Sequence, residues 1–282
     1  MSSTRTLTWS DALTLASRGH ALSAGDARRL LQQVTGATPA QVIAWPGRQL
    51  GSIDQMRFTS LVERRAGGEP MAYLVGTRDF YSRSFRVDAR VLIPRPETEG
   101  LIDAALARLP VGGAPEVVDL GTGSGCVGIT LALEQPNLKV LGVDASADAL
   151  EVARANARAL ECSTIDFVQG DWLHGIDGQR LTMIVANPPY VAEDDAHLTE
   201  GDLRFEPRQA LSPGGDGLVA LRTIIMQAPA ALADYGWLIV EHGYDQAAAV
   251  GALLAAHGFV DLFCERDLAG HERISGGRIL RR

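Results

Sequence analysis

The sequence predicts an α/β protein in which a seven-stranded, doubly wound sheet follows a small helical domain and a β-hairpin. From about residue 97 onward, helical stretches alternate with short apolar strands, as in a mostly parallel sheet. Residues 10–67 show apolar residues at helical spacing. Between these regions, aromatic and β-branched residues alternate with polar ones around Ser82, Arg83 and Ser84, which favours a hairpin. We therefore expect a helical domain at 1–70, a hairpin linker at 71–96 and the α/β domain at 97–282.

The helical domain is indicated by apolar spacing and by start and stop signals. The segment DARRLLQQV places four apolar residues on one helical face, namely Ala27, Leu30, Leu31 and Val34. Thr38 followed by Pro39 is typical of the start of the next helix. The segment IDQMRFTSLVERRAGG ends in arginines and then glycines, as a helix C-terminus often does.

The α/β domain is indicated by seven apolar or β-branched runs. We expect strands at Glu116–Leu120, Lys139–Asp144, Ile165–Gln169, Leu181–Ala186, Trp237–Glu241, Phe259–Glu265 and Gly277–Leu280. Helical stretches such as 145–160 and 216–232 lie between the earlier strands. The pattern predicts five strand–helix units followed by two late strands.

Composition favours a soluble protein of a reducing compartment. The chain has 282 residues, of which 46% are hydrophobic and 21% charged, and it has no apolar run near the length of a membrane span. Its first residues lack the apolar core of a secretory signal. Cys126, Cys162 and Cys264 cannot all pair, and neither they nor the six histidines show a metal-binding spacing. We expect a cytoplasmic protein without a metal.

The charge is unevenly distributed along the chain. Residues 1–95 hold 13 Arg and no Lys against 7 Asp and Glu, so 13 − 7 = +6. The total of 26 basic and 34 acidic residues leaves 13 − 27 = −14 for the remainder. An acidic main body argues against direct binding of nucleic acid. The basic first third either docks an acidic partner or is simply a solvated surface, and the charges alone leave both interpretations open.

A glycine loop follows the first strand of the α/β domain. In VVDLGTGSGC the residues Gly121, Thr122, Gly123, Ser124 and Gly125 form a G-x-G-x-G pattern, which lets the backbone turn sharply and approach a ligand. A dinucleotide fingerprint would continue with a sixth-position glycine, where this chain has a cysteine. Taken alone, the loop is also compatible with an ordinary strand-to-helix turn.

An acidic residue narrows the interpretation of that loop. Asp144 ends the second strand, 144 − 125 = 19 residues after Gly125, where a carboxylate can bind both hydroxyls of a ribose. The two features predict a nucleoside pocket without a phosphate site, and S-adenosylmethionine (SAM) fits it. Asp171 and Trp172 follow the third strand, and the indole of Trp172 offers a flat face for adenine, or else a cover for the core.

The sequence Asn187-Pro188-Pro189-Tyr190 follows the fourth strand. In a doubly wound sheet this strand end neighbours the glycine loop, so Asn187 is expected beside the reactive methyl group. The side-chain carbonyl of Asn187 and the backbone carbonyl of Pro188 can accept both hydrogens of an incoming –NH₂ group. Each proline restricts the residue before it, which fixes the two acceptors in advance. Tyr190 can pack on the planar group that carries the nitrogen.

The Asn-Pro-Pro-Tyr sequence alone does not indicate whether the –NH₂ group belongs to adenine, guanine or glutamine. Longer segments of the chain favour one of the three. In order along the chain these are GEPMAYLVGTRDFYSRSFRVDARVLIPRPETE, VVDLGTGSG, QGDW, NPPYV, EPRQALSPGGDGL, VEHGYDQ and RDLAGHERISGGR. They resemble the bacterial release-factor glutamine methyltransferases, from about residue 10 to the end of the chain. Gly100, after PRPETE, departs from the aliphatic or acidic residue expected there.

The resemblance implies a class I SAM-dependent methyltransferase domain behind the helical domain and hairpin. It implies methylation of the amide nitrogen of the glutamine in the Gly-Gly-Gln loop of class I peptide-chain release factors. By motif, the catalytic residues would be Asn187, Pro188 and Tyr190, and the substrate-binding residues Asn187, Pro188, Pro189 and Tyr190. The cofactor-binding residues would be Gly121, Thr122, Gly123, Ser124, Gly125, Asp144, Trp172 and Asn187.

Three other functions compete with this interpretation. A nucleic-acid amino methyltransferase, acting on adenine N6 or guanine N2, would use the same corner but needs a basic groove beside it. A nicotinamide-dependent oxidoreductase would need the G-x-G-x-x-G spacing. A binding module without catalysis would retain cofactor binding and show no turnover.

Overall fold

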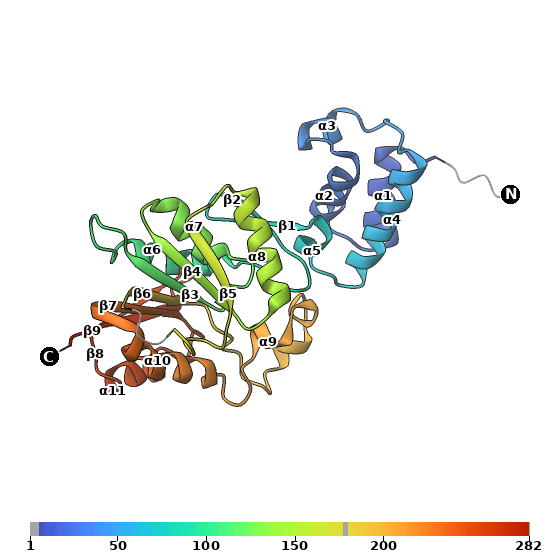
Figure 1. Cartoon of the computed structure of the whole chain (residues 1–282). Coiled ribbons are helices and arrows are strands. Elements are labelled where there is room, and N and C mark those ends of the chain that lie inside the picture. Colours follow the sequence, from blue (N-terminus) through green and yellow to red (C-terminus); the bar gives the residue numbers. More distant parts are fainter. Residues whose placement is uncertain (1–5, 177–179, 282) are drawn as a thin grey trace. The chain divides into compact units, whose positions relative to one another are not determined.

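The computed structural model describes residues 6–176 and 180–281, which divide into two compact units, 1–76 and 77–282 (Figure 1). The first unit is helical, with α1 Trp9–Gly19, α2 Ala24–Thr35, α3 Pro39–Ala44, α4 Ser52–Ala66 and α5 Met71–Val75. The second unit carries two sheets and the remaining helices.

The helices of the first unit begin at side-chain caps. Thr8 and Thr38 form capping boxes with Asp11 and Gln41, and the Ser23 hydroxyl accepts a hydrogen bond from the backbone N–H of Asp26. The apolar faces meet in one core that includes Trp9, Phe58 and the residues expected on α2, namely Ala27, Leu30, Leu31 and Val34. The helical domain predicted from the apolar spacing is therefore present.

The helical unit extends past residue 70, where the sequence placed its end. Leu74 of α5 packs into the helical core, and Gln33 Nε2 donates a hydrogen bond to the carbonyl oxygen of Val75 at 3.0 Å. These contacts tie α5 to the first unit, whereas the hairpin belongs to the second.

The hairpin consists of β1 Thr77–Phe80 and β2 Arg83–Arg86, joined by Tyr81 and Ser82. Both joining residues have positive φ (47° and 59°), as a two-residue hairpin turn requires. The prediction of a turn at 82–84 was wrong by one to two residues, because Tyr81 looks like a strand residue. Its backbone N–H donates to Glu99 Oε1 at 2.7 Å and its hydroxyl to Asp103 Oδ1 at 2.9 Å, and these bonds hold it in the turn.

The main sheet has seven strands in the order β5-β4-β3-β6-β7-β9-β8. Their bounds are β3 Glu116–Leu120, β4 Lys139–Asp144, β5 Ile165–Gln169, β6 Leu181–Ala186, β7 Leu232–Glu241, β8 Phe259–Arg266 and β9 Glu272–Ile279. The pairs from β5 to β7 are parallel, and β9 runs antiparallel to both of its neighbours. The strand order reverses between β3 and β6, which is where ligands bind in such sheets.

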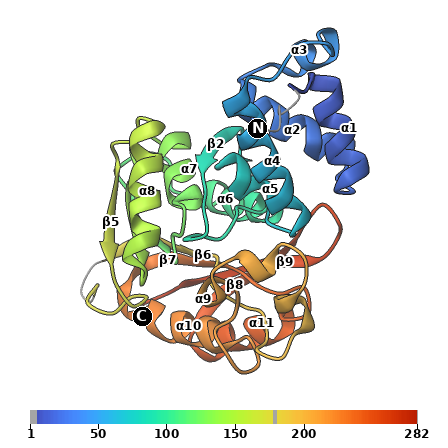
Figure 2. The same cartoon turned by 90° about the vertical axis from the view of Figure 1, so that its right-hand side faces the viewer.

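Helices cover both faces of the sheet (Figures 1 and 2). One apolar core joins the sheet to α6 Glu99–Leu106, α7 Cys126–Glu134 and α8 Ala147–Ala159. The other joins it to α10 Val219–Ala231 and α11 Ala247–Ala256. Short elements at the edge of the sheet are η1 Pro96–Thr98, η2 Ala196–Thr199, η3 Leu203–Phe205 and α9 Arg208–Leu211.

The predicted strands β3 to β6 have the bounds expected from the sequence, and the later ones differ. β7 begins at Leu232 because Asp234, Tyr235 and Gly236, which look like a turn, form an irregularity within the strand, with Tyr235 at φ +63°. β9 begins at Glu272, although its charged start suggested a loop. Its glycine at 276 is required by packing, since a Cβ there would lie 2.7 Å from the ring of Phe263. No helix joins β5 to β6 among the described residues, so the expected series of five strand–helix units is interrupted there.

Candidate active site

The glycine loop and the Asn-Pro-Pro-Tyr corner leave the sheet side by side. Strands β3 and β6 pair in parallel, with Leu120 opposite Ala186, so Gly121 and Asn187 follow neighbouring strand ends. This arrangement is the one expected from the sequence. It brings a backbone loop and an amide side chain to one point at the edge of the sheet.

The glycine loop has a conformation that needs glycine. Gly121, Gly123 and Gly125 have φ of 69°, 55° and 81°, and a Cβ on Gly125 would lie 2.7 Å from Ile129 Cδ1. Asp119 anchors the loop from below: its Oδ2 accepts hydrogen bonds from the Thr122 hydroxyl at 2.6 Å and the Gly128 backbone N–H at 2.9 Å. Burial raises the pKa of Asp119 to about 6, because the charged form is desolvated.

Asp144 also braces the loop. Its Oδ2 accepts the backbone N–H of Gly123 at 2.8 Å, and its Oδ1 accepts that of Ser146 at 2.9 Å. Burial raises the pKa of this carboxyl as well. Each carboxylate oxygen retains a second lone pair, and Asp144 lines the cavity beside the loop. The carboxylate therefore has a structural task, and the ligand-binding role that the sequence suggested stays a prediction.

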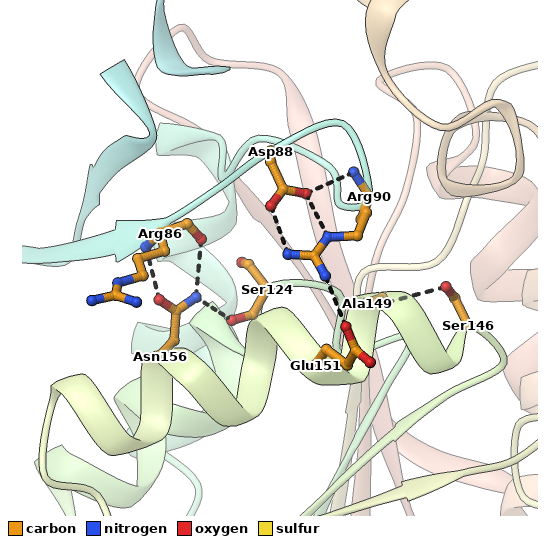
Figure 3. A network of polar contacts seen from close by, with 8 residues as sticks. All are labelled: Arg86, Asp88, Arg90, Ser124, Ser146, Ala149, Glu151 and Asn156. Carbon is orange, nitrogen blue, oxygen red and sulfur yellow. Dashed lines mark hydrogen bonds and ion pairs between the residues drawn. The ribbon is translucent and has the colours of Figure 1, made fainter. Parts of the chain in front are cut away.

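A buried asparagine links the loop to the segment after the hairpin (Figure 3). Asn156 of α8 donates from Nδ2 to the carbonyl oxygens of Ser124 (2.8 Å) and Arg86 (3.0 Å), and its Oδ1 accepts the N–H of Arg86. Arg90, four residues later, pairs with Asp88 and Glu151 and lines the same cavity as Asp144. The chain after the hairpin is thus fixed at the rim of that cavity.

Three cavities meet at Leu92 and Asn187. The adenosine-side cavity, as we name it, is lined by Gly121, Gly123, Asp144, Asp171, Trp172 and Asn187 among others. The inner cavity runs from Arg95 and Thr98 along the glycine loop to Cys126. The outer cavity is lined by Arg95, Pro188, Pro189, Tyr190, Tyr244 and Arg273 among others. Asn187 is the side chain with an amide that belongs to all three.

Trp172 lies between a cavity and the apolar core. It lines the adenosine-side cavity, and its ring lies 3.6 Å from the position of a Cβ on Gly121. It also packs against the apolar core below the sheet. Its φ of +50° is unfavourable for a bulky residue, and such strain is often found where a site fixes a side chain.

The Asn-Pro-Pro-Tyr corner is held from several sides. The Asn187 amide donates from Nδ2 to the Thr98 hydroxyl at 3.0 Å, which leaves Oδ1 as the acceptor end. The backbone carbonyl of Tyr190 accepts Gln246 Nε2 at 3.0 Å. Gly217 approaches the same carbonyl so closely that a Cβ there would lie 2.4 Å from it. Pro188 is buried, and Pro189 lines both the adenosine-side and the outer cavity.

Below Tyr190 lies a buried carboxylate. The Tyr190 hydroxyl donates to Glu241 Oε1 at 3.2 Å, whereas Oε2 has no hydrogen-bond partner among the described residues. Glu241 is 1% exposed, and its desolvation raises its pKa to about 7. Burial also raises the pKa of Tyr190, so its hydroxyl stays protonated. At the other side of the outer cavity, the fully buried Glu206 pairs with Arg95 and accepts the N–H of Ile93 at 3.0 Å.

Comparisons with known proteins match segments of both units of the chain. Residues 103–233 match the family model "Methyltransferase small domain", and residues 10–76 match "PrmC N-terminal domain". The release factor glutamine methyltransferase of Burkholderia pseudomallei is 46% identical over 268 residues, covering 93% of this chain and 94% of that protein. The one of Neisseria gonorrhoeae is 46% identical over 258 residues, with coverages of 91% and 93%.

The chain belongs to the release factor glutamine methyltransferase family.

A methyltransferase from Pyrococcus furiosus has the same fold, with a TM-score of 0.54 at 14% identity over 82% of this chain and 100% of that one. The class I methyltransferase fold expected from the sequence is therefore confirmed. Among the described residues, no helix is long and apolar enough to span a membrane. The described part of the chain also holds no cluster of three His, Cys, Asp or Glu arranged for a metal.

Several residues of this family member's site were not assigned roles from the sequence. Asp119 precedes the glycine loop and Asn156 sits within a helix, so neither stands out by type or spacing. Thr98 and Glu241 lie within the quoted segments IPRPETE and VEHGYDQ, but only the fold shows that both contact the Asn-Pro-Pro-Tyr corner. Gln246 also lies in VEHGYDQ, but nothing in the sequence indicates that its side chain bonds the backbone carbonyl of Tyr190.

Proposed function

We propose that this chain transfers a methyl group from SAM to the side-chain amide nitrogen (N5) of the glutamine in the Gly-Gly-Gln motif of class I peptide-chain release factors. Membership of the release factor glutamine methyltransferase family supports the reaction. The observation that carries the site assignment is the position of Asn187, which lines the adenosine-side, inner and outer cavities together.

The residues around the adenosine-side and inner cavities fit SAM. The loop from Gly121 through Gly125, with Thr122 and Ser124, presents backbone rather than side chains to the methionine part. Asp144 would accept hydrogen bonds from the ribose, and Trp172 would lie against the adenine. When bound, SAM supplies a methyl group already activated by its positive sulfonium. An anchored loop without a pyrophosphate-binding glycine pattern suits such a phosphate-free ligand.

The outer cavity is where the acceptor glutamine would enter. Asn187 Oδ1 and the carbonyl oxygen of Pro188 would each accept one hydrogen of the –NH₂ group, and Tyr190 would pack on its plane. Held in this way, the nitrogen lone pair faces the methyl carbon for in-line displacement. Positioning of this kind contributes on the order of 7–11 kcal/mol to a two-reactant step.

Among the described residues, no histidine lines the outer cavity, so no neutral imidazole is available there as a base. The buried His242 is engaged on both ring nitrogens, by the Gly243 carbonyl and the Ser275 hydroxyl, at 2.8 Å each. We infer that the chain works by orientation and by polar preorganisation at the nitrogen, and that the proton is lost after transfer. Pro188 and Tyr190, with Asn187, would be the catalytic residues.

We propose that some arginines of the helical unit help to dock the release factor. The sequence singles out Arg28, Arg29, Arg57, Arg64 and Arg65. Arg64 pairs with Glu69 and Arg65 with Asp26, which weakens their attraction for a partner. Arg28, Arg29 and Arg57 are exposed and make no ion pair among the described residues, so they are the better candidates. An acidic partner would then associate more slowly as salt is added, whereas a rate independent of salt would contradict such docking.

The direct test is to incubate the full chain with SAM and a purified class I release factor. The peptide that spans Gly-Gly-Gln is then analysed by mass spectrometry. We expect a gain of one methyl group on the glutamine, and none on the same factor with that Gln replaced by Ala. Retained SAM binding without this gain would overturn the proposed acceptor and favour a nucleic-acid amino group instead. Since translation factors act in the cytoplasm, we propose a cytoplasmic location as well.

A further inference from the structure

The start of β9 forms part of the wall of the outer cavity. Arg273 lines this cavity, and Ile274 after it pairs with Glu241 at the end of β7. The backbone carbonyl of Arg273 also accepts the N–H of His242 at 2.9 Å. Strand β7 is parallel to β6, so this edge of the sheet is also the one at which Asn187 follows β6. Arg273 therefore belongs to the same edge as the Asn-Pro-Pro-Tyr corner.

One carboxylate shapes the turn before β9 and holds the Arg273 side chain. Asp267 Oδ1 accepts the backbone N–H groups of Ala269 and His271 at 2.9 Å each. Its Oδ2 accepts Arg273 Nε at 3.2 Å. The Asp267 side chain is 5% exposed, so water competes little for this pair. The guanidinium is thereby given a fixed position at the cavity.

This pairing leaves other donors of the guanidinium unused. An arginine carries several N–H groups in a planar fork, and the bond to Asp267 takes only the one on Nε. Nη1 and Nη2 make no hydrogen bond among the residues that the structure describes. Arg95, another cation of the outer cavity, pairs with Glu206 and also lines the inner cavity. Arg273 lines only the outer one of the three cavities, so its free N–H groups serve the occupant of that cavity.

An aromatic ring lies beside this guanidinium. The guanidinium carbon of Arg273 is 5.8 Å from the centre of the Tyr244 ring, and the His271 ring is also 5.8 Å from it. The loop of Tyr244 is tied to the corner, because Gln246 Nε2 donates to the carbonyl oxygen of Tyr190 at 3.0 Å. Tyr244 is 63% exposed and lines the outer cavity, so its ring is an open wall next to Arg273.

The proposed acceptor offers few side chains for recognition. In a Gly-Gly-Gln segment the two glycines have none, and the amide of the glutamine would be engaged at Asn187. What remains is the peptide backbone, whose carbonyl oxygens need hydrogen-bond donors when they leave water. Glycine also lets that backbone approach a neighbouring surface closely. A fixed guanidinium fork beside an open aromatic ring provides both the donors and the surface.

We propose that Arg273 is a substrate-binding residue that donates hydrogen bonds to the backbone carbonyl oxygens of the two residues before the acceptor glutamine, while Tyr244 packs against their Cα atoms. This inference rests on the proposed function, because it takes the outer cavity as the entrance for the glutamine. It gives the segment RDLAGHERISGGR a task, since Asp267 of that segment fixes the guanidinium. It also makes small residues before the glutamine a requirement of the cavity.

Steady-state kinetics of the full chain with a class I release factor test the assignment. Bonds to backbone carbonyls form before methyl transfer and persist through it, so their loss should raise KM and leave kcat nearly unchanged. For Arg273→Gln we expect KM for the release factor to rise about 10- to 150-fold, the factor for lost hydrogen bonds from a charged donor. The SAM Kd, measured by calorimetry, should stay unchanged. A higher SAM Kd with an unchanged KM would assign the guanidinium to SAM and overturn the proposal.

Arg278→Gln is the matched control. Arg278 lies on the same strand and pairs with Asp261, and its guanidinium carbon is 5.4 Å from the centre of the Tyr235 ring. It lines none of the three cavities. A purely structural role for Arg273 predicts that both variants lower the melting temperature and leave KM as it is. The proposal predicts that only Arg273→Gln raises KM.

Two further variants distinguish the fork from its charge and the ring from its hydroxyl. Arg273→Lys keeps a positive charge without the planar fork, so we expect KM to stay raised. A normal KM in this variant would contradict hydrogen bonds from the fork to the backbone. Tyr244→Phe should bind the release factor normally, and Tyr244→Ala should raise KM by less than Arg273→Gln does. An unchanged KM in Tyr244→Ala would remove the ring from the proposal.

Peptide binding separates this inference from the proposed function. The probe is a fluorescent peptide that spans Gly-Gly-Gln, and its comparison carries valines in place of the two glycines. Fluorescence anisotropy is measured with the full chain and S-adenosylhomocysteine. We expect the glycine peptide to bind the unmodified chain and Arg278→Gln more tightly than Arg273→Gln, and the valine peptide to bind all three weakly. Equal affinity for the two peptides would contradict a requirement for small residues.

The two assays together decide which statement fails. Methylation of the release factor with an unchanged KM and peptide affinity in Arg273→Gln would leave the reaction standing and show that the role of Arg273 is wrong. No methylation, with peptide binding that depends on Arg273, would contradict the proposed reaction and support the peptide site. Neither methylation nor peptide binding in the unmodified chain would overturn both.

Discussion

The two sides of Asn187 are built in different ways. On the side where we propose that SAM binds, here the cofactor side, carboxylates accept hydrogen bonds from backbone groups: Asp119 from the N–H of Gly128 and Asp144 from that of Gly123. On the side where we propose that the glutamine enters, here the acceptor side, side chains bond side chains that are far apart in sequence. Asn187 bonds Thr98 across 89 residues, and Tyr190 bonds Glu241 across 51.

This difference indicates which kind of substitution should impair each side. A backbone-built loop fails when a side chain is added where only glycine fits, because the loop conformation itself changes. A side-chain network fails when a single polar atom is lost or reversed, while the backbone stays in place. We therefore expect defects in cofactor binding and folding from the first side, and defects in turnover from the second.

The largest effect is expected from Asn187→Ala. It removes a preorganised acceptor at the reacting nitrogen, and we expect turnover to fall by about 10²- to 10³-fold. Single-turnover methylation followed by mass spectrometry measures the rate, and calorimetry measures the SAM Kd. Asn137→Ala, which removes an exposed amide, is the control. Near-normal turnover in Asn187→Ala would show that the acceptor side does not work through this amide.

The two sides should also differ in how pH affects stability. Asp119 on one side has its pKa raised from 3.8 to about 6, and Glu241 on the other from 4.5 to about 7. A carboxyl whose pKa is raised by folding binds more protons when folded, so stability falls as pH rises between the two values. Each group should lower the free energy of unfolding by about 3 kcal/mol across its own window.

Urea unfolding from pH 4 to 8 at constant ionic strength tests this expectation. Asp119→Asn should flatten the change between about pH 4 and 6, and Glu241→Gln the change between about pH 4.5 and 7. A free energy of unfolding that rises steadily over this range in the unmodified chain would contradict both assignments.

A smaller effect is expected from Gly125→Ala on the cofactor side. The new methyl group would meet Ile129 at 2.7 Å and Ala153 at 3.2 Å, and φ is +81°. Overpacking of this kind destabilises by about 1–3 kcal/mol. Gly113→Ala is the matched control, since Gly113 has φ +75° but no atom within 4 Å of the Cβ position. Thermal unfolding should therefore show a larger loss for Gly125, and equal losses would mean that φ strain alone matters.

The smallest effect is expected at Gly100, outside both sides. It lies in the first turn of α6, and a Cβ there would make an ordinary contact of 3.6 Å with Ile274 Cγ1. Gly100→Ala should stabilise the protein by about 0.4–1 kcal/mol by reducing the freedom of the unfolded chain. Turnover should be unchanged, and a loss of stability in thermal melts would mean that the contact with Ile274 is too tight.

The same division explains what could be predicted from the sequence. Strands β3 to β6 are apolar runs ended by glycine, aspartate or asparagine, so their bounds and the loop that follows β3 were recognisable. The glycine loop and the Asn-Pro-Pro-Tyr corner carry their conformation in their own residue types.

The rest depended on contacts that no local pattern records. A threonine after Pro-Glu looks like a helix start, and a glutamate at the end of an apolar strand looks like a surface residue. Only the pairing of β6 with β7 places Glu241 beneath Tyr190. For Asp144, the sequence correctly predicted the position at the end of β4. It did not predict the hydrogen bonds that the carboxylate accepts from the backbone of Gly123 and Ser146.

The meeting of three cavities at Asn187 has a consequence for how substitutions affect the two reactants. The adenosine-side and outer cavities share Leu92, Asn187, Pro189 and Ala210, while their other linings differ. If SAM occupies the first cavity and the glutamine loop the second, as proposed, most of each lining touches only one of the two reactants. Substitutions in the unshared parts of the two linings should then weaken the binding of one reactant and leave that of the other unchanged.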